Sequence, residues 1–430
     1  MTRLFILFFI LINFIGCNKK IEESKKIELM FLDDYIFPAS QLFDSTKVGG
    51  LSGIDYHDGN YYLVADDSKL PRYYKATIEI EKKLIVQIDF VDMVLFRDHP
   101  YYENQTLDLE SIVFDTNNQI TMVSEGAINK NKNPLLFSTK YNGEFLFDFE
   151  LPTNFLVSHE PKPVHNKTLE GLSNSYHNDG FWTAFELPLI QDGDEPSYQK
   201  ANSPIRITYF DKKTRKATKE FAYQLEPITK PYVGDYNLNG VTDILEFKPN
   251  HFIVIERTYQ SEKGTQGNTI NLFHAWIEKT STNTLTINSL KQTDFIPLKK
   301  ELVFSFDTVK NKLTEGIIDN IEGITLGPIL ENGNQSIILI SDDNFQLFGK
   351  QLNQFLLLEI NSGYSSSILN GCTCVEGKTA ASYLPSKSAI SLNHSLRILE
   401  ASTISSMLSD CPRIISHIKG FFINLRFIGS

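Results

Sequence analysis

Cysteine is scarce in this chain of 430 residues. The sequence has four cysteines, and none lies between Cys17 and Cys372. Small secreted domains that lack an adequate core depend on disulfides, but this chain has 41% hydrophobic and 12% aromatic residues. The long region between these cysteines is therefore expected to fold on its apolar core alone, even in an oxidising compartment.

Basic residues are too few to balance the acidic ones. Lys and Arg number 41 against 52 Asp and Glu, which gives a formal net charge of −11. A chain of this charge repels the phosphates of nucleic acid and the headgroups of anionic lipid. We therefore expect no nucleic-acid partner, and an acidic body suited to holding cations, or anions through cations.

Long apolar segments are also missing, apart from one near the start. The run from Leu4 to Ile15 is apolar except for Asn13, and it follows the basic Arg3. It is shorter than the ~20 residues that a transmembrane helix needs. Its length and its basic flank are typical of a signal peptide over residues 1–16.

The apolar run ends in Gly16-Cys17, a small residue before a cysteine, which resembles the lipobox of bacterial lipoproteins. We predict lipidation at Cys17 and a polar tether over residues 17–27. The chain would then be exported and held on the periplasmic or cell-surface face of a bacterial membrane, touching it only through the lipid anchor. The alternative is an ordinary signal peptide that happens to contain a cysteine.

Helical periodicity is absent as well, since no segment carries a 3.6-residue apolar stripe over three turns. Apolar stretches are short, alternate with period two and are rich in Ile, Val, Phe, Tyr and Thr. Residues 61–65, 205–210 and 251–256 are examples, and Gly, Asn and Asp turns separate such stretches. The pattern predicts an all-β fold.

A self-similar unit recurs five times along the chain. Its first strand is followed by a turn and by a second strand that ends in an acid. The units begin at Gly50, Asp108, Leu169, Asp243 and Ile321, and their second strands end at Asp66-Asp67, Glu125, Glu186, Glu256-Arg257 and Asp342-Asp343. The starts lie 58 to 78 residues apart, which suits four-stranded propeller blades with long loops.

We predict a β-propeller over residues 28–360, with five blades, and a monomer. Strand counting leaves the last blade one strand short, and residues 28–32 are available to complete it and close the ring. The outer strand of the fourth unit is assigned to 285–290 or to 302–306. Six blades are the alternative, if the fourth unit hides a degenerate repeat.

Residues 361–430 differ in character from the rest. They contain 15 serines and three of the four cysteines but no copy of the repeat. We expect a poorly ordered C-terminal extension outside the ring.

The repeated acids predict a site on the propeller axis. Innermost strands surround a central channel, so a residue repeated at one blade position forms a ring. A ring of carboxylates repels itself and persists only with cations, protons or basic partners. We expect four glutamates to occupy equivalent places and converge on one axis: Glu110, Glu170, Glu246 and Glu322. For any single acid, capping a turn or binding backbone N–H groups between blades is the alternative.

These repeated segments resemble the phytase-like family of bacterial exported proteins, described as having esterase-like activity of phytase. The matching segments are Gly50-Leu-Ser-Gly-Ile54 with Ala65-Asp-Asp-Ser68, Asp108-Leu-Glu-Ser-Ile112 with Ser124-Glu-Gly126, Leu169-Glu-Gly-Leu172 with Phe185-Glu186, Asp243-Ile-Leu-Glu246 with Val254-Ile-Glu-Arg257, and Ile321-Glu-Gly-Ile324 with Ser341-Asp-Asp343. The resemblance implies phosphoester hydrolysis, with the recurrent Glu and Asp as its working groups.

Carboxylates cannot neutralise a phosphate directly, but they can hold Ca²⁺, which then bridges to a small phosphorylated substrate. The predicted catalytic residues are Glu110, Glu125, Glu170, Glu186 and Arg257. The predicted metal ligands are Asp66, Asp67, Glu246, Glu256, Glu322 and Asp342. Arg257 would clamp the phosphate with its bidentate fork, and a salt bridge to an acid of a neighbouring blade is the alternative.

A second calcium signal lies in residues 235–246. Asp235, Asn237, Asn239 and Gly240, followed by Glu246, have the spacing of an EF-hand loop. Proline before and after the segment argues against two flanking helices, so an Asn-Gly turn between strands is the preferred interpretation.

The leading function is therefore a calcium-assisted phosphoester hydrolase. A calcium-dependent lactone hydrolase and a non-catalytic ligand-binding or scaffold lipoprotein are the alternatives. Basic residues facing the acidic ring would favour phosphate, Asn ligands with few basic groups would favour a lactone, and a plugged channel would favour binding.

Overall fold

The computed structural model of the protein describes residues 27–97, 99–115 and 118–361. The expected signal peptide, the lipidation site Cys17, most of the tether and nearly all of the C-terminal extension lie outside these residues. Within the described part of the chain, no helix has the length and apolar character needed to traverse a bilayer. The predicted propeller lies inside the described part and can be compared strand by strand.

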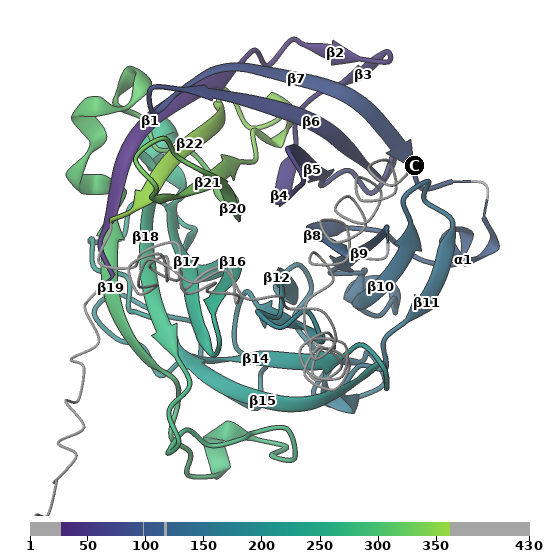
Figure 1. Cartoon of the computed structure of the whole chain (residues 1–430). Helices are drawn as coiled ribbons and strands as arrows, with labels where there is room; N and C mark the ends of the chain where they lie inside the picture. The colour runs from purple at the N-terminus through teal and green to yellow at the C-terminus, as the bar shows by residue number, and fades with distance from the viewer. Residues whose placement is uncertain (1–26, 98, 116–117, 362–430) are drawn as a thin grey trace, which may run out of the picture. The chain divides into compact units, whose positions relative to one another are not determined.

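Five four-stranded antiparallel sheets form a ring of blades around a central channel (Figure 1). Blade 1 contains β4 (Leu51–His57), β5 (Asn60–Ala65), β6 (Arg72–Glu81) and β7 (Leu84–Leu95). Blade 2 contains β8 (Leu109–Asp115), β9 (Gln119–Ser124), β10 (Leu135–Lys140) and β11 (Phe145–Asp148). Blade 3 contains β12 (Leu169–Asn174), β13 (Gly180–Phe185), β14 (Pro204–Asp211) and β15 (Lys216–Gln224). Blade 4 contains β16 (Asn237–Lys248), β17 (His251–Gln260), β18 (Asn268–Trp276) and β19 (Lys299–Ser305). Blade 5 contains β20 (Ile321–Ile329), β21 (Gln335–Ser341), β22 (Asn353–Ile360) and β1 (Leu29–Phe37).

The remaining elements lie in loops. They are the hairpin β2 (Leu42–Phe43) and β3 (Thr46–Lys47), helix α1 (Pro100–Glu103), and the 3₁₀ helices Ile128–Lys130, Thr153–Phe155, Ser261–Gln266, Leu290–Gln292, Phe306–Thr308, Lys310–Lys312, Thr314–Gly316 and Asn344–Gln346.

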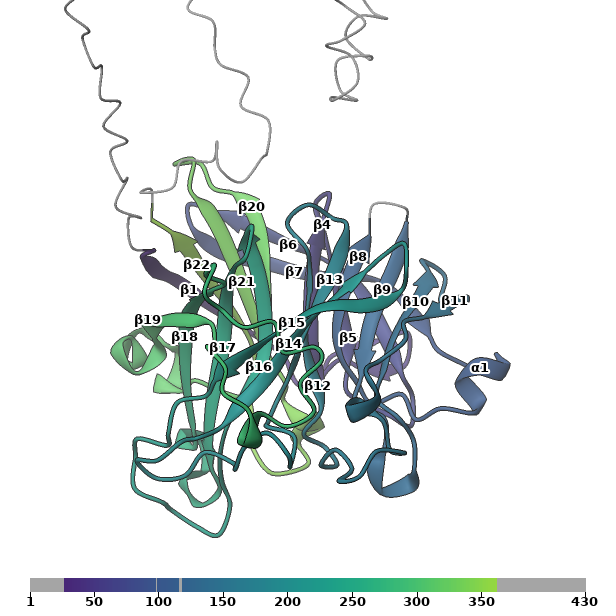
Figure 2. The same ribbon diagram turned by 90° about the horizontal axis from the view of Figure 1, so that it is seen from below.

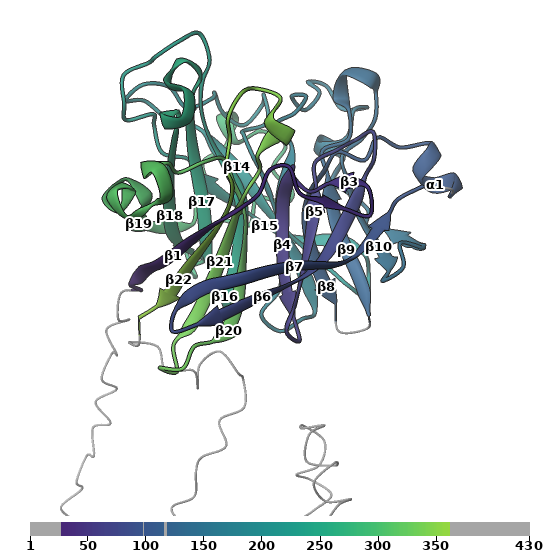
Figure 3. The same ribbon diagram turned by 90° about the horizontal axis from the view of Figure 1, so that it is seen from above.

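The N-terminal strand closes the ring, as predicted. β1 pairs antiparallel with β22, from Leu29 opposite Ile360 to Phe37 opposite Asn353. The two strands lie side by side at the edge of the ring in both side views (Figures 2 and 3). The first and last described strands therefore complete one sheet, and the five-blade prediction is confirmed. The outer strand of blade 4 is Lys299–Ser305, the second of the two assignments considered.

The core lies between adjacent blades, because each sheet buries both faces against its neighbours. Apolar residues of β21 and β22 pack with those of β4, β5 and β6 in one cluster, which includes Leu63, Tyr74, Ile340 and Leu357. Such burial stabilises the fold by roughly 25 cal/mol per Å² of apolar surface. The alternation seen in the sequence thus serves inter-blade packing rather than one wet and one dry face.

Every innermost strand carries a β-bulge at the same place. In each one the pairing register skips one residue: Ser52, Glu110, Glu170, Thr242 and Glu322. A bulge leaves its extra residue out of the ladder and turns its side chain to a new direction. We call the end of the channel where the inner strands begin the proximal end, and the other the distal end.

Just after the bulge the inner strands come into direct contact. The residues at this level are Gly53, Ser111, Gly171, Asp243 and Gly323. A Cβ on Gly53 would lie 2.6 Å from the Cα of Ser111, and one on Gly171 would lie 3.0 Å from the nitrogen of Ile244. Blades 1 and 3 therefore need glycine here, because any side chain would push the adjacent strands apart.

The carboxyl group of Asp243 fills the channel at this level. Its Oδ1 accepts hydrogen bonds from the backbone nitrogens of Leu172 (3.1 Å) and Ile244 (2.9 Å), and its Oδ2 accepts one from Ile324 (3.0 Å). The hydroxyl of Ser111 donates at 3.4 Å. The donors belong to blades 2, 3, 4 and 5, so this one side chain, 1% exposed, ties four inner strands together and closes the channel.

We expect Asp243→Asn to destabilise the protein by about 2–4 kcal/mol, because an amide offers one acceptor oxygen where three backbone N–H groups now find partners. Urea unfolding of the full chain measures this. The matched control is Asp89→Asn on the exposed face of β7, which should stay within about 0.5 kcal/mol of wild type. Equal stability of the two variants would contradict the axial role of Asp243.

Candidate functional site

Three glutamates converge at the proximal end because of the bulges. Glu110, Glu170 and Glu322 are the bulged residues of blades 2, 3 and 5. In blades 1 and 4 the same position holds hydroxyl residues, whose Oγ atoms donate to the inner strand of the next blade. Ser52 bonds the carbonyl of Leu109 and Thr242 that of Ile321, each at 2.9 Å. The bulge thus supplies an acid in three blades and a link between blades in two.

A second set of side chains comes from one equivalent position in each blade. This position directly follows the second strand in blades 1, 2, 3 and 5 and lies inside β17 in blade 4. The backbone nitrogen of the residue at this position reaches back to the start of the inner strand, as from Asp66 to the carbonyl of Gly50 at 2.7 Å. The five residues at this position are Asp66, Glu125, Glu186, Arg257 and Asp342. Four blades therefore place an acid here, and blade 4 places an arginine.

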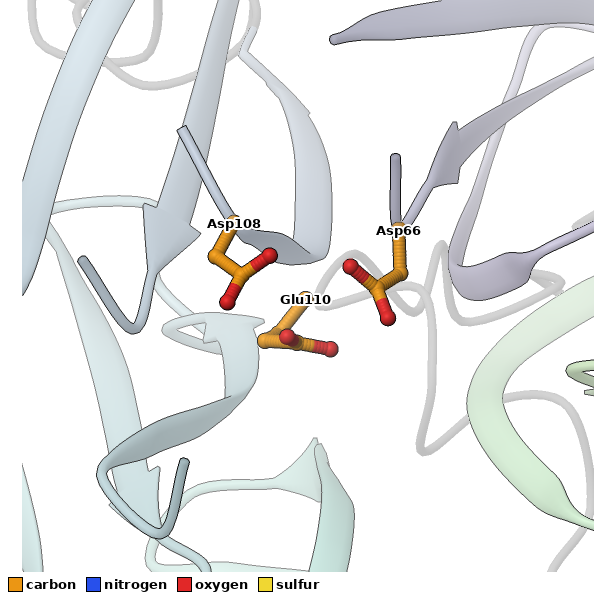
Figure 4. Close-up of side chains that lie close together, drawn as sticks. All are labelled: Asp66, Asp108 and Glu110. Carbon is orange, nitrogen blue, oxygen red and sulfur yellow. The ribbon is translucent and has the colours of Figure 1, made fainter. Parts of the chain in front are cut away.

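Together these side chains form the acidic cluster, defined as Asp66, Asp108, Glu110, Glu125, Glu170, Glu186, Glu322, Asp342 and Arg257. Carboxylate oxygens of Asp66, Asp108 and Glu110 all lie within 4.8 Å of one another, and so do those of Glu110, Glu125 and Glu170. Figure 4 shows the first three carboxyl groups turned toward a common space from β8 and the segments before it and after β5. Glu110 belongs to both groups.

Arg257 occupies the other side of the cluster. Its guanidinium forms ion pairs with Glu322 and, at 3.6 Å, with Glu186, and it also donates to the side-chain oxygen of Asn320. Burial lowers the pKa of Arg257, but the nearby carboxylates of Glu322, Glu186 and Glu170 raise it by more than burial lowers it. The guanidinium therefore stays charged. The pairing that was the alternative for Arg257 is present, and it neutralises only part of the cluster.

The carboxyl groups of the cluster are hard to ionise. Burial first, and then the neighbouring acids, raise the pKa of Glu110 well above its ordinary value. The pKa values of Glu170, Glu125, Asp66 and Asp342 are raised for the same two reasons. For Glu186 burial raises the pKa to about 7, against the lowering effect of Arg257. The acids Asp66, Asp108, Glu110, Glu125 and Glu170, which form no ion pair with a described basic residue, therefore ionise together only with a cation among them.

Three of the predicted metal ligands lie outside the cluster, and two of them are Asp67 and Glu256. The carboxylate of Asp67 does not join that of Asp66. It forms an ion pair with Arg72 at 2.8 Å. Glu256 stands one residue before Arg257, the residue of blade 4 that enters the cluster. Its carboxylate accepts hydrogen bonds from the hydroxyl of Tyr223 in blade 3 and from the ammonium of Lys300 in its own blade, each at 2.7 Å. These two acids have structural roles.

The third is Glu246, and the prediction that it occupies a place equivalent to Glu110 is wrong. Its carboxylate accepts hydrogen bonds from the nitrogens of Tyr176 (2.7 Å) and Asn250 (2.6 Å) and from the indole of Trp182 (3.1 Å), in the distal half. The pairing of β16 with β17 puts Thr242 at the bulge instead. Both interpretations of the EF-hand spacing fail too, because Asn237–Lys248 is one continuous strand and forms neither a calcium loop nor a turn.

Two polar residues of the site were not singled out from the sequence. Asp108 and Asn320 each stand two positions before a bulged glutamate. Asp108 completes the first group of carboxylates, and Asn320 donates to Glu322 at 2.8 Å. The signal was present in the repeat, where the residue at this offset is polar in blades 2, 3 and 5.

The donor set fits a hard divalent cation. Ca²⁺ is bound by oxygens at about 2.3–2.6 Å, so two ligands of one ion lie at most about 5 Å apart. Both carboxylate groups meet this limit and contain oxygen donors alone. Cysteine and histidine ligands, which zinc favours, are absent from both groups.

Comparison with solved structures finds other propellers at low similarity. An endo-arabinase from Bacteroides thetaiotaomicron matches with 10% identity and a TM-score of 0.40, over 76% of this chain and 97% of its own. An exo-β-1,3-galactanase from Clostridium thermocellum matches with 11% identity and a TM-score of 0.40, over 75% and 61%. A luciferin-regenerating enzyme matches with 10% identity and a TM-score of 0.33, over 78% and 95%. Values this low say nothing about what this chain binds.

The family comparison is more informative. A search of curated proteins finds no match. Residues 46–345, which span all five inner strands and every member of the acidic cluster, match the phytase-like family, described as esterase-like activity of phytase. The match extends over more than half of the chain and agrees with the resemblance seen in the repeated segments. The chain belongs to the phytase-like family.

Proposed function

We propose that this protein is a phosphoester hydrolase that works with calcium held by the acidic cluster. The observation that carries the proposal is the division of the cluster into two unlike halves. Asp66, Asp108, Glu110, Glu125 and Glu170 form no ion pair with a basic residue in the described part of the chain, whereas Arg257 pairs with Glu186 and Glu322 in the other half. A phosphoester needs both a cation site and an anion clamp, and these halves supply one of each.

The five carboxylates of the first half would hold the cation. Because Glu110 belongs to both groups of three, it would help to hold a cation bound by either group. When bound, calcium neutralises phosphate oxygens and lowers the pKa of a bound water. The remaining work belongs to the side chains of the chain itself.

Arg257 and Glu186 are suited to orient substrate and to move a proton. The guanidinium is held rigidly by Glu322 and Glu186 and presents a planar fork, which matches two oxygens of a phosphate. Glu186 has a pKa of about 7, so near neutral pH it exchanges a proton readily and can act as the general base.

Two other functions remain in view. The closure of the channel at Asp243 favours a non-catalytic protein, in which cations bound by the cluster hold the blades together. Asn320 among the acids is the kind of ligand that would favour a lactone hydrolase. Arg257, paired with Glu186 and Glu322 on one side of the cluster, is the reason for preferring phosphate.

We also propose that the protein is exported and tethered by lipid at Cys17. β1 runs antiparallel to β22, so the described chain begins and ends at the distal end of blade 5. A tether that starts there would leave the proximal end, with the acidic cluster, on the side away from the membrane.

Hydrolysis of p-nitrophenyl phosphate by the full chain should be lost in chelator and restored by calcium. Glu110→Gln should lower kcat/KM by about 10²-fold or more, since it removes a ligand common to both carboxylate groups. Glu144→Gln on the surface is the matched control and should keep wild-type activity. Activity that survives chelation, with Glu110→Gln unaffected, would refute the proposal.

Arg257→Lys should separate phosphate from lactone. Lysine keeps the charge but loses the fork, so KM for the phosphoester should rise about tenfold with a smaller change in kcat. Hydrolysis of a neutral lactone, if present, should be unchanged. A lactone rate that falls while phosphoester turnover stays the same would favour the alternative.

The stability of the chelated protein should depend on pH in a defined direction. Folding raises the pKa of these acids, so each contributes its full stabilisation below its ordinary pKa, which is near 4.5 for a glutamate. This contribution is lost as the pH rises through the pKa in the folded state, which is about 7 for Glu186. When the folded and unfolded pKa of one group differ by a single pH unit, the free energy of unfolding changes by about 1.4 kcal/mol. Chelated protein should therefore melt at a lower temperature at about pH 8 than at about pH 5.

Calcium should reverse this loss at the higher pH and have little effect at the lower, because protons compete for the same oxygens. Thermal unfolding with and without calcium at both pH values measures it. In Glu110→Gln the calcium-dependent gain should shrink. An equal calcium effect at both pH values would argue against binding by these carboxylates.

A further inference from the structure

The distal half of the channel contains a cavity of about 350 Å³ on the other side of Asp243 from the acidic cluster. All five inner strands contribute to its wall. The segments that line it are Ile54–Tyr56, Val113, Leu172–Tyr176, Leu245–Phe247, Ile324–Gly327 and Gln335. No member of the acidic cluster lines this chamber, and the hydrogen bonds of Asp243 join the inner strands between the two.

The wall of the cavity combines apolar, neutral polar and acidic side chains. Two carboxyl groups line it, Asp55 and Glu246, and among the described residues of the wall there is no Lys, Arg or His. Lys212 lies close to the rim beside Asn174, but its ammonium is paired with Asp115 at 3.0 Å. An anionic ligand would therefore meet repulsion, and a cation would meet attraction.

Asp55 is held in place as a hydrogen-bond acceptor. Its Oδ2 accepts from the backbone nitrogen of Phe114 at 2.7 Å, and its Oδ1 accepts from the hydroxyl of Thr325 at 3.2 Å. These donors come from blades 2 and 5, so the carboxyl group of blade 1 is fixed before any ligand arrives. Burial raises the pKa of Asp55 to about 7, against the lowering effect of its hydrogen bonds to Phe114, Tyr56 and Thr325.

A buried hydroxyl beside the cavity has no partner. Tyr61 is 1% exposed, and its OH makes no hydrogen bond within the described residues. Its ring packs on that of Tyr56 in the cavity wall, with 4.9 Å between centroids. A Cβ on Gly327, another wall residue, would lie 3.5 Å from this hydroxyl. The hydroxyl of Tyr61 is thus a buried polar group that no described residue satisfies, which is costly unless a ligand or water reaches it.

We propose that the distal cavity binds a small organic ammonium compound. Its N–H groups would donate to Asp55 and to the hydroxyl of Tyr61, and its aliphatic body would contact the apolar wall formed by Ile54, Leu172 and Ile324. Tyr56 adds an aromatic face that attracts a cation. The volume lies at the lower end of the range for ligand pockets, so the ligand is small. The site does not depend on the hydrolase proposal.

Three probes of matched size and different charge test the site: n-butylammonium, 1-butanol and n-butyrate. Ligand-observed NMR titration of the full chain, in excess calcium to occupy the acidic cluster, should give binding of the ammonium compound. The neutral probe should bind about tenfold more weakly, and the anion not at all. Equal affinity for the cation and the anion would overturn the proposal.

Variants locate the binding. Asp55→Asn should weaken n-butylammonium binding about tenfold, and Tyr61→Phe about threefold, whereas Glu170→Gln at the proximal end should leave it unchanged. Tyr61→Phe removes only an unpaired hydroxyl, so it should fold normally even if Asp55→Asn does not. Binding that is lost in Glu170→Gln but kept in Tyr61→Phe would assign the amine to the acidic cluster and overturn the distal site.

Discussion

Mutual repulsion among buried carboxyl groups is the constraint around which the proximal end is organised. Eight acids meet one guanidinium in the acidic cluster, and Arg257 pairs with two of them, Glu186 and Glu322. Glu110, Glu170, Glu125, Asp66 and Asp342 have raised pKa values because burial and like charges both oppose ionisation. Such an arrangement is stable only with protons or cations among the oxygens. The chemistry proposed for the protein follows from how this charge is offset.

The scaffold that imposes this crowding is simple. A bulge at one place in each innermost strand turns Glu110, Glu170 and Glu322 toward the axis, and the close strand contact just beyond it leaves no room to spread apart. Asp243 closes the channel at that level with hydrogen bonds to three other blades as well as its own. Three backbone N–H groups bind this one carboxylate, whereas in the acidic cluster Glu125 and Asp342 each accept a single one, from Thr168 and Asn344. This contrast separates a structural acid from acids available for a ligand.

Much of this architecture could be predicted from the sequence. The recurring unit indicated five blades, the spare N-terminal strand indicated how the ring closes, and the repeated acids indicated a cluster on the axis. Blade 4 was misread because its repeat was aligned on the acid Glu246. Its apolar residues Val241 and Ile244 set the register, and they put Thr242 at the bulge.

Two smaller errors concern pairs of consecutive residues. Asp66 and Asp67 follow β5, and only Asp66 joins the cluster, because the carboxylate of Asp67 binds Arg72 and the backbone nitrogen of Leu70 in the turn that follows. In blade 4 successive residues of the strand face opposite ways, which selects Arg257 over Glu256. The axial role of Asp243 was not accessible from the sequence, because it depends on contacts between strands 71 to 132 residues apart along the chain.

The most direct test of the account is a crystal structure of the protein grown with calcium, with anomalous differences measured at a long wavelength. The account predicts anomalous peaks among the carboxylates of Asp66, Asp108 and Glu110, and of Glu125 and Glu170, with oxygen distances of about 2.3–2.6 Å. No peak at the proximal end at saturating calcium, or calcium bound only elsewhere on the surface, would contradict it.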